Sequence, residues 1–502
     1  MMVPHMHDHS VKRVVIAGGG TAGWTVASLL ARQLGSLLDI TLVESDAIGT
    51  VGVGEATIPT FRSFHALLGI DEREFMRATQ STFKLGISFE NWDRIGDRYI
   101  HPFGDVGKST WMAEFHHMWL MAKAKGFGGD LGRCCFEHEV AIAGKFAVSE
   151  SSKLNYAYHL DAGLYARFLR QKFEPQGVKR IEGRITGAEQ DSESGYVTAL
   201  VMENGDRVSG DLFIDCTGFR GLLIEETLAA GYEDWRHWLP TDSALAVQTE
   251  LSQVPPYTQA MARSAGWQWR IPLQHRAGNG LVFCSAYQDK TEAQDELLGH
   301  LEGAPLTDPR LIRYTTGRRR KCWDKNVVAI GLSSGFLEPL ESTSIHLIQI
   351  AAVRLIQLFP FGGNFKALAR RYNRQMHDDF EQIRDFIILH YKLTHRDDTP
   401  FWRACRDMDI PDTLAERIEL FSDSGYIRPA SEELFQTASW LFVMTGQGLM
   451  PRNHHYMGAL LGDERLRKAL ESLQQNIVNA VNSMPSHDDF LHKYCPSDIP
   501  PS

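Results

Sequence analysis

Apolar and polar positions near the start of the chain predict a strand, a tight turn and a helix, in that order. The apolar run 14–17 leads into three consecutive glycines, and apolar residues then recur at helical spacing as far as Leu34. A second apolar run, residues 40–43, ends in Glu44, about 20 residues beyond the glycines, where a ribose-binding carboxylate is expected. In this strand–turn–helix context, a G-x-G-x-x-G pattern indicates a dinucleotide-binding unit.

Each glycine of the pattern has a physical role. Gly18 permits the tight turn, Gly20 lets the backbone approach a pyrophosphate, and Gly23 lets the helix pack close to the strand. The helix N-terminus then offers free N–H groups to the phosphates. The following loop, residues 45–60, is interrupted by glycines and too polar for a core strand, which favours a ligand-contacting loop over an ordinary connector.

Two later strands are predicted to return to this unit. After alternating strands and an Asn204-Gly205 pair, the strongest short-range hairpin signal, an apolar run at 211–215 ends in a turn of small residues. A second apolar run covers residues 326–330. Late strands that rejoin an early dinucleotide unit suit a large FAD domain better than a compact NAD domain. We therefore predict an α/β fold, with a Rossmann-type FAD-binding domain and an inserted β-sheet.

The C-terminal part is predicted to be mainly helical. Residues 345–358 are apolar nearly all round, so this helix should be deeply buried, and the Ser/Thr-rich turn before it offers free N–H groups to an anion. Beyond residue 365 the predicted helices span residues 372–392, 434–445 and 464–484, before a polar tail. We expect residues 1–362 to form the FAD-binding module and residues 363–502 a helical region packed on it as one unit.

The sequence pattern alone favours structural roles for Lys84 and for the pair Trp267 and Trp269. The alternation over residues 83–89 predicts a half-buried strand with Lys84 on its opposite face, which favours a solvated lysine. Trp267 and Trp269 lie on the same face of a strand that Pro272 ends, which favours a bulky ridge in the core.

Other features keep two interpretations each. Glu338 or Glu341, before the buried helix, either complements the helix dipole or takes part in chemistry. Aromatic and histidine residues crowd residues 92–119, where they either build core or line a pocket for a flat ligand. Further helices are predicted over residues 61–79 and 157–172.

Composition narrows the class of protein. The chain of 502 residues is 43% hydrophobic and 23% charged, as in ordinary soluble proteins, and its net charge of -10 argues against a nucleic-acid partner. No apolar run reaches the roughly 18 residues of a membrane helix, and the N-terminus lacks the apolar core of a signal peptide. Seven scattered cysteines without a CxxC favour reduced thiols, no metal site and a cytoplasmic location. His5, His7 and His9 are interpreted as a solvated tail rather than metal ligands.

Five separate motifs, in the right order, match one family. They are Gly18-Gly-Gly20-Thr-Ala-Gly23-Trp24, Gly52-Val-Gly54-Glu55-Ala-Thr57-Ile-Pro59, Thr82-Phe-Lys84-Leu-Gly86, Trp267-Gln-Trp269-Arg-Ile271-Pro272 and Pro339-Leu-Glu341-Ser-Thr343. The chain thus resembles the flavin-dependent tryptophan halogenases over nearly its whole length, and W-x-W-x-I-P is the most specific of the five motifs. This resemblance replaces the interpretations that the patterns alone favour for Lys84 and for the tryptophan pair.

The resemblance implies a GR2-type, monooxygenase-like fold and a two-component reaction. Reduced FAD, supplied by a separate NAD(P)H flavin reductase, would react with O2, and the resulting flavin hydroperoxide would oxidise chloride or bromide to hypohalous acid. The substrate would be a small electron-rich aromatic such as tryptophan or indole. The resemblance is compatible with a monomer or a homodimer.

The same resemblance assigns roles to individual residues. Lys84 matches the lysine that holds the oxidised halogen, by hydrogen bonding or as a haloamine, and Glu341 matches the carboxylate that orients the electrophile and deprotonates the arene intermediate. The halide would lie by the backbone of Thr343 and Ser344. The implied FAD contacts are Gly18, Gly20, Thr21, Ala22, Gly23, Glu44, Val53, Gly54, Ala56 and Leu337. The implied substrate and passage residues are His101, Phe103, Trp267, Trp269, Ile271, Pro272 and Ser342.

Two features depart from the family pattern. Ser344 replaces a glycine at the presumed halide position, and the replacement would cost about 1 kcal/mol if the backbone there required φ above zero. The region that grips the amino acid head group of tryptophan in well-known members is not recognisable in residues 447–455. Indole or another electron-rich arene therefore stands beside free tryptophan as a candidate substrate.

Two other functions stay open at the level of the sequence. A flavin-dependent aromatic hydroxylase would need neither Lys84 nor Glu341. A flavin-binding protein that has lost catalysis would have no chemical reason to retain both of them.

Overall fold

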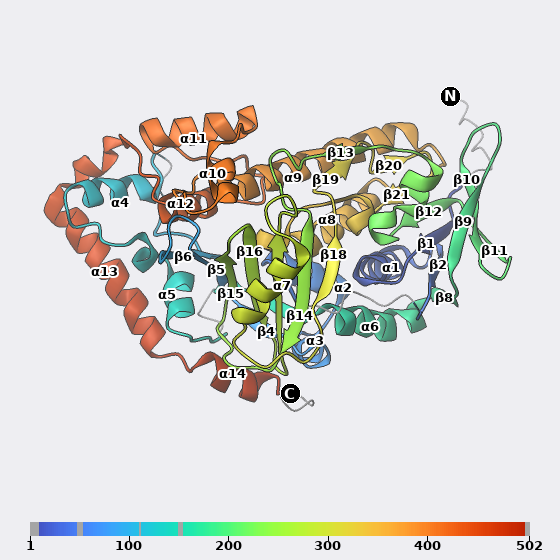
Figure 1. Cartoon of the computed structure of the whole chain (residues 1–502), viewed down its shortest axis with the longest axis horizontal. Coiled ribbons are helices and arrows are strands. Elements are labelled where there is room, and N and C mark those ends of the chain that lie inside the picture. Colours follow the sequence, from blue (N-terminus) through green and yellow to red (C-terminus); the bar gives the residue numbers. More distant parts are fainter. Residues whose placement is uncertain (1–9, 48–53, 110–111, 149–153, 497–502) are drawn as a thin grey trace, which may run out of the picture.

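The structure is a computed structural model that describes residues 10–47, 54–109, 112–148 and 154–496. Several residues named above lie outside these ranges, namely His5, His7, His9, Gly52 and Val53, as does Trp111 of the aromatic stretch 92–119. The dinucleotide unit lies at one end of the molecule and the helices α11 to α13 at the other, with β-sheet between them (Figure 1).

The predicted dinucleotide unit forms a six-stranded sheet in the order β20-β21-β12-β1-β2-β8. Its strands are β1 (Arg13–Ala17), β2 (Asp39–Glu44), β8 (Val178–Glu182), β12 (Leu212–Asp215), β20 (Trp323–Asp324) and β21 (Val327–Ala329). Neighbouring strands are parallel except β20 and β21. Helix α1 (Thr21–Leu34) follows β1 and contacts both α6 (Ala162–Phe173) and α8 (Ser344–Gln357). Both predicted return strands, β12 and β21, are confirmed.

A seven-stranded sheet occupies the middle of the molecule, in the order β18-β14-β17-β16-β15-β5-β6. Its strands are β5 (Gly86–Glu90), β6 (Arg98–Pro102), β14 (Ser243–Thr249), β15 (Thr258–Ala262), β16 (Gly266–Pro272), β17 (Ala277–Phe283) and β18 (Arg310–Arg313). A small sheet, β3-β7-β4, connects the FAD loop to the strand that ends in Lys84. Its strands are β3 (Gly54–Ala56), β4 (Thr82–Lys84) and β7 (Ala157–Asp161).

Two further three-stranded sheets contain the remaining strands. One is β11-β10-β9, with β9 (Ile185–Gln190), β10 (Val197–Met202) and β11 (Arg207–Ser209). The other is β13-β19-β22, with β13 (Tyr232–Asp234), β19 (Gly317–Arg319) and β22 (Gly335–Phe336). Gly205, at φ 87°, lies in the turn between β10 and β11, so the predicted Asn-Gly hairpin is confirmed.

Three local predictions have wrong boundaries. The predicted helix 61–79 is two helices, because Gly69 at φ 66° ends the first in the left-handed conformation. The predicted strand 83–89 is two strands in different sheets, so both of its faces are buried. The predicted helix 157–172 begins as β7 and turns helical only after Asp161, whose side chain caps α6.

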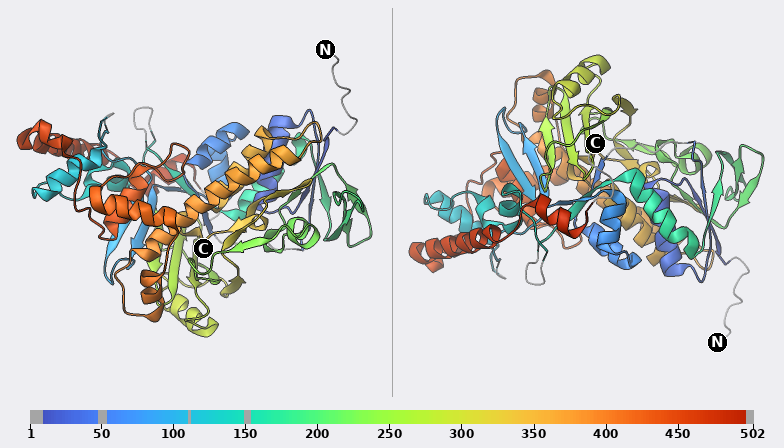
Figure 2. Two further views of the ribbon diagram at one scale, coloured as in Figure 1. Left: turned by 90° about the horizontal axis from the view of Figure 1, so that it is seen from above. Right: turned by 90° about the horizontal axis from the view of Figure 1, so that it is seen from below.

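The chain beyond residue 365 is mainly helical, as predicted, and the long helix α9 runs lengthwise along the molecule (Figure 2). The remaining helices are α2 (Thr60–Leu68), α3 (Glu72–Thr79), α4 (Phe115–Ala124), α5 (Phe136–Ile142), α7 (Lys290–Gly299), α9 (Lys366–Lys392), α10 (Pro400–Asp407), α11 (Asp412–Ser424), α12 (Thr437–Gly446), α13 (Asp463–Asn482) and α14 (His487–Tyr494). The prediction of a polar tail after α13 is wrong, because α14 returns to pack on β4.

Aromatic residues fix α14 against the lysine strand. The ring of Phe83, in β4, stacks on Phe146 at 4.0 Å and meets the edges of Phe490 at 5.6 Å and Tyr494 at 5.9 Å. His487 accepts a hydrogen bond at Nε2 from the backbone N–H of Phe83, at 3.3 Å. The last helix therefore forms part of the support beneath Lys84.

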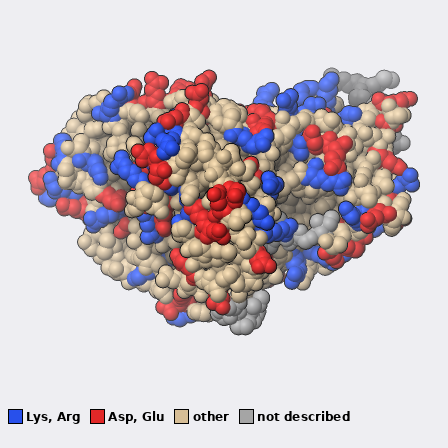
Figure 3. Space-filling view, in the orientation of Figure 1, with Lys and Arg blue, Asp and Glu red and all other residues tan. Residues whose placement is uncertain are grey.

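The main hydrophobic core draws on both predicted parts of the chain, from Val11 to Cys495, while the division at residue 362 stays a prediction. On the face shown in Figure 3, acidic side chains are interspersed with basic ones. Across the four described ranges, no helix combines the length and the apolar character needed to cross a membrane. All seven cysteines are free thiols.

Candidate active site

The glycine turn between β1 and α1 has the geometry of a phosphate cradle. Gly18 has φ 104°, and a Cβ added there would lie 2.4 Å from the carbonyl oxygen of Cys216. A Cβ on Gly23 would lie 1.8 Å from the carbonyl oxygen of Gly18, so only glycine permits this approach of helix to strand. A Cβ on Gly20 would meet no atom within 4 Å, so this position faces open space. Thr21 and Ala22 form the first turn of α1, where N–H groups lack helical acceptors.

Glu44 ends β2 beside this turn. A Cβ on Gly19 would lie 1.7 Å from Oε2 of Glu44, which places the carboxylate directly against the glycines. Its Oε2 accepts a hydrogen bond from Nε1 of Trp24 at 3.2 Å, and its Oε1 accepts one from Nε of Arg180 at 2.5 Å. A carboxylate offers about four lone-pair sites, so two protein donors leave room for ribose hydroxyls. Open space at Gly20 and this carboxylate together fit a dinucleotide such as FAD.

The FAD loop leads from this cradle toward the middle of the molecule. Gly54 and Ala56 lie in β3, and a Cβ on Gly54 would lie 3.0 Å from Cγ2 of Ile271. Leu337, between β22 and the turn before α8, is buried. Val53 lies outside the described residues. The predicted FAD contacts on the described part of the loop thus lie next to the predicted passage residue Ile271.

Lys84 is fully buried at the end of β4, and the solvated position that the pattern alone favours is wrong. Its Nζ donates to Oγ of Ser342 at 2.7 Å and to the carbonyl oxygen of Thr57 at 3.1 Å, and it lies 5.0 Å from the ring centroid of Phe103. Burial lowers the pKa of the ammonium from 10.5 to about 7, against the opposing effect of the nearby charge of Glu341. A lysine with this pKa exchanges protons readily near neutral pH.

Glu341 is also buried and is held by two histidines. Its Oε2 lies 2.9 Å from Nδ1 of His101, and its Oε1 lies 2.8 Å from Nε2 of His390. Burial alone would raise the pKa of this carboxyl group, but the electrostatic effect of His101 and the hydrogen bonds of both histidines lower it to about 2. Lys84 and Glu341 meet through Ser342 rather than by a direct hydrogen bond.

The turn before α8 explains how serine is tolerated at the presumed halide position. Ser342, not Ser344, takes the left-handed conformation, with φ 60°. Ser344 is the first residue of α8, and Thr343 before it has φ -91°. The replacement of glycine by serine at position 344 therefore adds no left-handed strain, and the start of the helix keeps N–H groups free for an anion.

The tryptophan pair is buried on β16, as the pattern predicts. Nε1 of Trp267 donates to Oε2 of Glu338 at 2.8 Å, and the hydroxyl of Tyr391 donates to the same oxygen at 2.6 Å. Burial raises the pKa of Glu338, whereas these two donors oppose the rise. The ring of Trp269 lies on Gly280, where a Cβ would come within 2.1 Å of it.

Aromatic side chains surround His101, on β6. Its ring lies 5.6 Å from that of Phe386 and 6.2 Å from that of Phe435, and these two phenylalanines stack at 3.8 Å. Pro272, at the end of β16, accepts a hydrogen bond at its carbonyl oxygen from the hydroxyl of Thr82, the first residue of β4. His101 thus lies between Glu341 and an apolar wall that the sequence analysis did not identify.

Four residues of this site were missed from the sequence: Phe386, His390, Tyr391 and Phe435. Tyr99 lies in the aromatic stretch 92–119, for which core and pocket were both left open. The available signal was a polar pair, His390 and Tyr391, at the end of an otherwise apolar run in a predicted helix. Each member of the pair donates to one carboxylate of the turn before α8: His390 to Glu341, and Tyr391 to Glu338.

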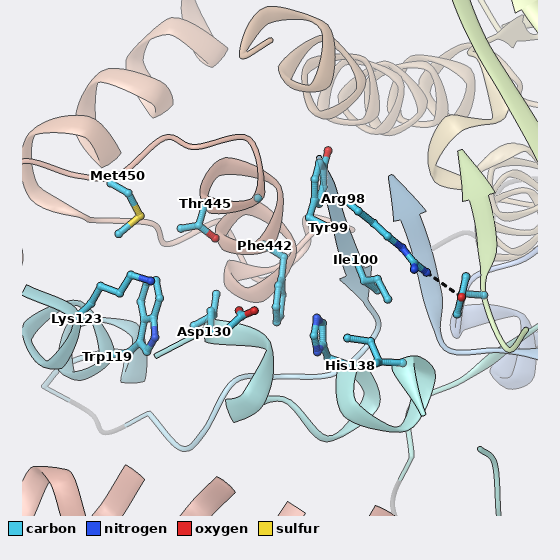
Figure 4. Close-up of a pocket in the computed structure, with 14 residues that line it drawn as sticks. Arg98, Tyr99, Ile100, Trp119, Lys123, Asp130, His138, Phe442, Thr445 and Met450 are labelled. Carbon is cyan, nitrogen blue, oxygen red and sulfur yellow. Dashed lines mark hydrogen bonds between the residues drawn. The ribbon is translucent and has the colours of Figure 1, made fainter. Parts of the chain in front are cut away.

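A separate cavity of about 500 Å³ lies beyond β6 (Figure 4). Its walls include Trp119, Lys123, Asp130, His138 and Phe442, with the rings of the last two stacked at 6.0 Å. The aromatic residues of the region 92–119 thus serve both purposes, since some build core and others line a cavity. In the described part of the chain, no three His, Cys, Asp or Glu side chains are arranged to hold a metal ion.

Comparisons with known proteins agree with this arrangement. The family model described as tryptophan halogenase matches residues 13–463. Tryptophan 6-halogenase SttH of Streptomyces toxytricini is 34% identical, over 97% of this chain and 99% of that protein. Among solved structures, Xcc4156, a flavin-dependent halogenase from Xanthomonas campestris, has a TM-score of 0.96 at 53% identity, covering 98% of this chain and 100% of that one.

A second solved structure gives the same result. BrvH, a flavin-dependent halogenase from Brevundimonas sp. BAL3, has a TM-score of 0.93 at 46% identity, covering 97% of this chain and 100% of that one. These matches confirm the resemblance, the fold class and flavin-dependent halogenation as the activity, and they do not favour a flavin hydroxylase. Their extent, over nearly the whole length of both partners, establishes that the chain belongs to the tryptophan halogenase family.

Proposed function

We propose that this protein halogenates a small electron-rich arene of the indole type, with Lys84 and Glu341 as its catalytic residues. The observation that carries the proposal is the burial of both side chains beside one another, joined through Ser342. Burying an ammonium and a carboxylate lowers the stability of the fold. A buried pair brought together from positions 84 and 341 is therefore typical of a functional site.

The bound cofactor is FAD, held by the glycine turn, Thr21, Ala22, Glu44 and the loop from Val53 to Ala56, with Leu337 nearby. When bound in its reduced form, FAD supplies the two electrons for the reaction of O2 with chloride or bromide that gives hypohalous acid. The N-terminus of α8, at Thr343 and Ser344, binds the halide. A separate NAD(P)H flavin reductase provides the reduced flavin, and the protein works in the cytoplasm as a monomer or homodimer.

The chain's own residues then direct the hypohalous acid to the arene. Trp267, Trp269, Ile271 and Pro272 line the passage and keep the arene away from the flavin. The Lys84 ammonium transfers a proton to the oxygen of the hypohalous acid as the oxygen–halogen bond breaks and the carbon–halogen bond forms, so that water leaves. Lys84 regains its proton from Glu341 after the substitution is complete.

Glu341 completes the substitution. It faces the ring, stabilises the cationic arene and takes the proton that the halogen replaces. His101 and Phe103 sandwich the aromatic ring. This balances as arene plus hypohalous acid giving haloarene plus water.

The apolar wall of Phe386 and Phe435 beside His101 supports an arene without a charged head group. SttH is named as a tryptophan 6-halogenase, so tryptophan is the second candidate substrate. We expect indole to be converted faster than free tryptophan.

The test uses purified protein with FAD, a flavin reductase, NADH and bromide, and a panel of indole, tryptophan and phenol. We expect bromoindole, identified by the isotope pair of bromine in its mass spectrum. Hydroxylated indole without bromoindole would overturn the proposal in favour of a hydroxylase. Oxidation of reduced flavin with no brominated product from any arene would indicate a flavoprotein without this activity.

A further inference from the structure

Behind Glu341, away from Lys84, lies a chain of three polar side chains, of which His390 and Gln447 are buried and Tyr99 is half-buried. Nδ1 of His390 lies 3.0 Å from the hydroxyl of Tyr99, and Nε2 of Gln447 donates to that hydroxyl at 3.3 Å. The same Nε2 donates to the backbone carbonyl of His390 at 3.0 Å. The chain runs from α12 through β6 and α9 to the carboxylate of Glu341.

With the imidazole of His390 neutral, the direction of every hydrogen bond in this chain follows from its donors and acceptors. An ionised carboxylate only accepts, so Nε2 of His390 carries the hydrogen that points to Glu341. Nδ1 of His390 then only accepts, so the hydroxyl of Tyr99 must donate to it. The backbone carbonyl of His390 fixes the amide of Gln447 with its nitrogen inward, so Gln447 donates to the oxygen of Tyr99. All donors therefore point toward Glu341.

Packing and protonation preserve this direction. Phe89 stacks on Tyr99 at 5.0 Å and on His390 at 4.5 Å, which prevents either ring from turning. Burial raises the pKa of Tyr99 well above its usual value, so its hydroxyl keeps its proton, and burial lowers the pKa of His390, so its imidazole stays neutral. The hydroxyl of Tyr99 points away from Asp130 and His138 of the separate cavity (Figure 4).

We propose that Tyr99 and His390 are positioning residues, which fix the tautomer of His390 and thereby hold Glu341 as an oriented acceptor that faces the substrate. The inference rests on the proposed role of Glu341. Without the hydroxyl of Tyr99, the imidazole is free to carry its hydrogen on Nδ1. Nε2 would then present a lone pair to Glu341, and the carboxyl group would turn or take up a proton before the arene arrives.

Three charged or titratable groups face Glu341 from the surrounding elements. They are His101 from β6, His390 from α9 and, through Ser342, Lys84 from β4. His101 and Lys84 lie on the substrate side, so the Tyr99–His390 pair is the part of this environment that a substitution can change without touching the substrate.

The test compares Tyr99→Phe, His390→Leu and His390→Gln with the wild type, in bromination of indole. Tyr99→Phe removes one oxygen and keeps the ring that stacks on Phe89. The matched control is Tyr257→Phe, because Tyr257 also lines the separate cavity and its hydroxyl accepts only from Arg98, at 2.8 Å. Formation of hypobromous acid without indole, followed with a chemical trap, checks that folding and flavin use are intact.

We expect Tyr99→Phe to lower kcat for bromoindole about 10-fold and His390→Leu about 100-fold, with little change in KM for indole. His390→Gln restores most of the loss, because its amide nitrogen replaces Nε2 as a donor to Glu341. Trapped hypobromous acid stays near the wild-type amount in Tyr99→Phe, and Tyr257→Phe matches the wild type throughout.

A spectroscopic measurement observes the tautomer directly. In protein labelled with ¹⁵N-histidine, the His390 signal, identified by its loss in His390→Gln, should show a protonated Nε2 and an unprotonated Nδ1. In Tyr99→Phe the two nitrogens should move toward one another as both tautomers become populated. This measurement needs neither halide nor substrate.

The outcomes separate the two proposals. A wild-type protein that brominates no arene overturns the proposed function and this inference with it. A wild-type protein that brominates indole, with Tyr99→Phe equally active and the tautomer of His390 unchanged, overturns the inference alone. Equal losses in His390→Leu and His390→Gln would also overturn it, since a purely structural role does not distinguish a donor from an apolar group.

Discussion

Nζ of Lys84 lies 2.7 Å from Oγ of Ser342, the residue that directly follows Glu341 in the chain. The serine therefore acts as a spacer between the ammonium and the carboxylate. A direct ion pair would engage the two groups with one another. With Ser342 between them, Lys84 keeps an N–H for the halogen donor, and Glu341 keeps a lone pair for the ring proton.

Replacing the lysine should separate formation of the oxidant from its use. We predict that Lys84→Met abolishes bromination of indole, while oxidation of reduced flavin and release of hypobromous acid continue at near the wild-type rate. Product is measured by mass spectrometry and the acid by trapping. Lys123→Met, at an exposed lysine on the separate cavity, is the matched control and should leave all three unchanged. Bromination by Lys84→Met at a near wild-type rate would refute the assignment.

The same substitution should stabilise the fold, because a buried ammonium opposes folding. Below pH 7 Lys84 is charged in both the folded and the unfolded chain, so the burial penalty is complete. Between pH 7 and 10.5 the folded chain has lost this proton while the unfolded chain retains it, so the penalty is relieved as pH rises. We predict that Lys84→Met raises the free energy of unfolding by about 2 kcal/mol at pH 6 and by less at pH 9. Urea unfolding at the two pH values measures it, and an equal gain at both would contradict the cause.

Glu341→Gln tests the carboxylate while conserving its shape. The amide can still meet one histidine donor but cannot accept the ring proton. We predict that bromoindole formation slows by about 100-fold, with KM for indole little changed. Single-turnover product formation is the measurement. A rate within threefold of the wild type would exclude Glu341 as the base.

Ser344→Gly restores the glycine of the family pattern. Because Ser344 has an ordinary helical backbone, the change relieves no strain, and we predict a loss of stability of up to about 1 kcal/mol. The N–H that we propose faces the halide is unchanged, so the KM values for chloride and bromide should each stay within about twofold. A large improvement in chloride use would instead show that the hydroxyl of Ser344 blocks the anion.

Replacing Trp267 should lower the stability of the fold more than replacing Trp269. Trp267→Phe removes a donor from the buried carboxylate of Glu338, whereas the ring of Trp269 packs on Gly280. We predict that Trp267→Phe costs about 2 kcal/mol more in free energy of unfolding than Trp269→Phe. Chemical denaturation of both variants measures this difference, and equal losses would contradict a role for the hydrogen bond.

The sequence alone was sufficient where an element carries its own periodicity or backbone requirement. The local sequence pattern predicted the glycine turn at Gly18, the return strand β21 and the buried helix α8. The burial of Lys84 was not predicted, because β4 and β5 belong to different sheets. The alternation of apolar and polar residues does not reveal where the chain passes from one sheet to another. The pattern therefore predicted an open face where the protein has a second layer.

The supporting residues of the site were hidden for a different reason. His390 and Tyr391 lie in α9, far along the chain from Tyr99, and only the folded arrangement shows which carboxylate each of them reaches. The family resemblance supplied Lys84 and Glu341 through their motifs. It also supplied His101 and Ser342, as substrate or passage residues, but it did not supply His390 or Tyr391.

The packing of α14 on β4 also sets an order of events during synthesis. The backbone N–H of Phe83, next to Lys84, donates to Nε2 of His487, 404 residues later. Before α14 has been synthesised, the ring of Phe83 lacks its contacts with the rings of Phe490 and Tyr494. The sheet of the flavin cradle is complete once β20 and β21 have been made, whereas the strand that would receive its oxidant gains its last support only with α14.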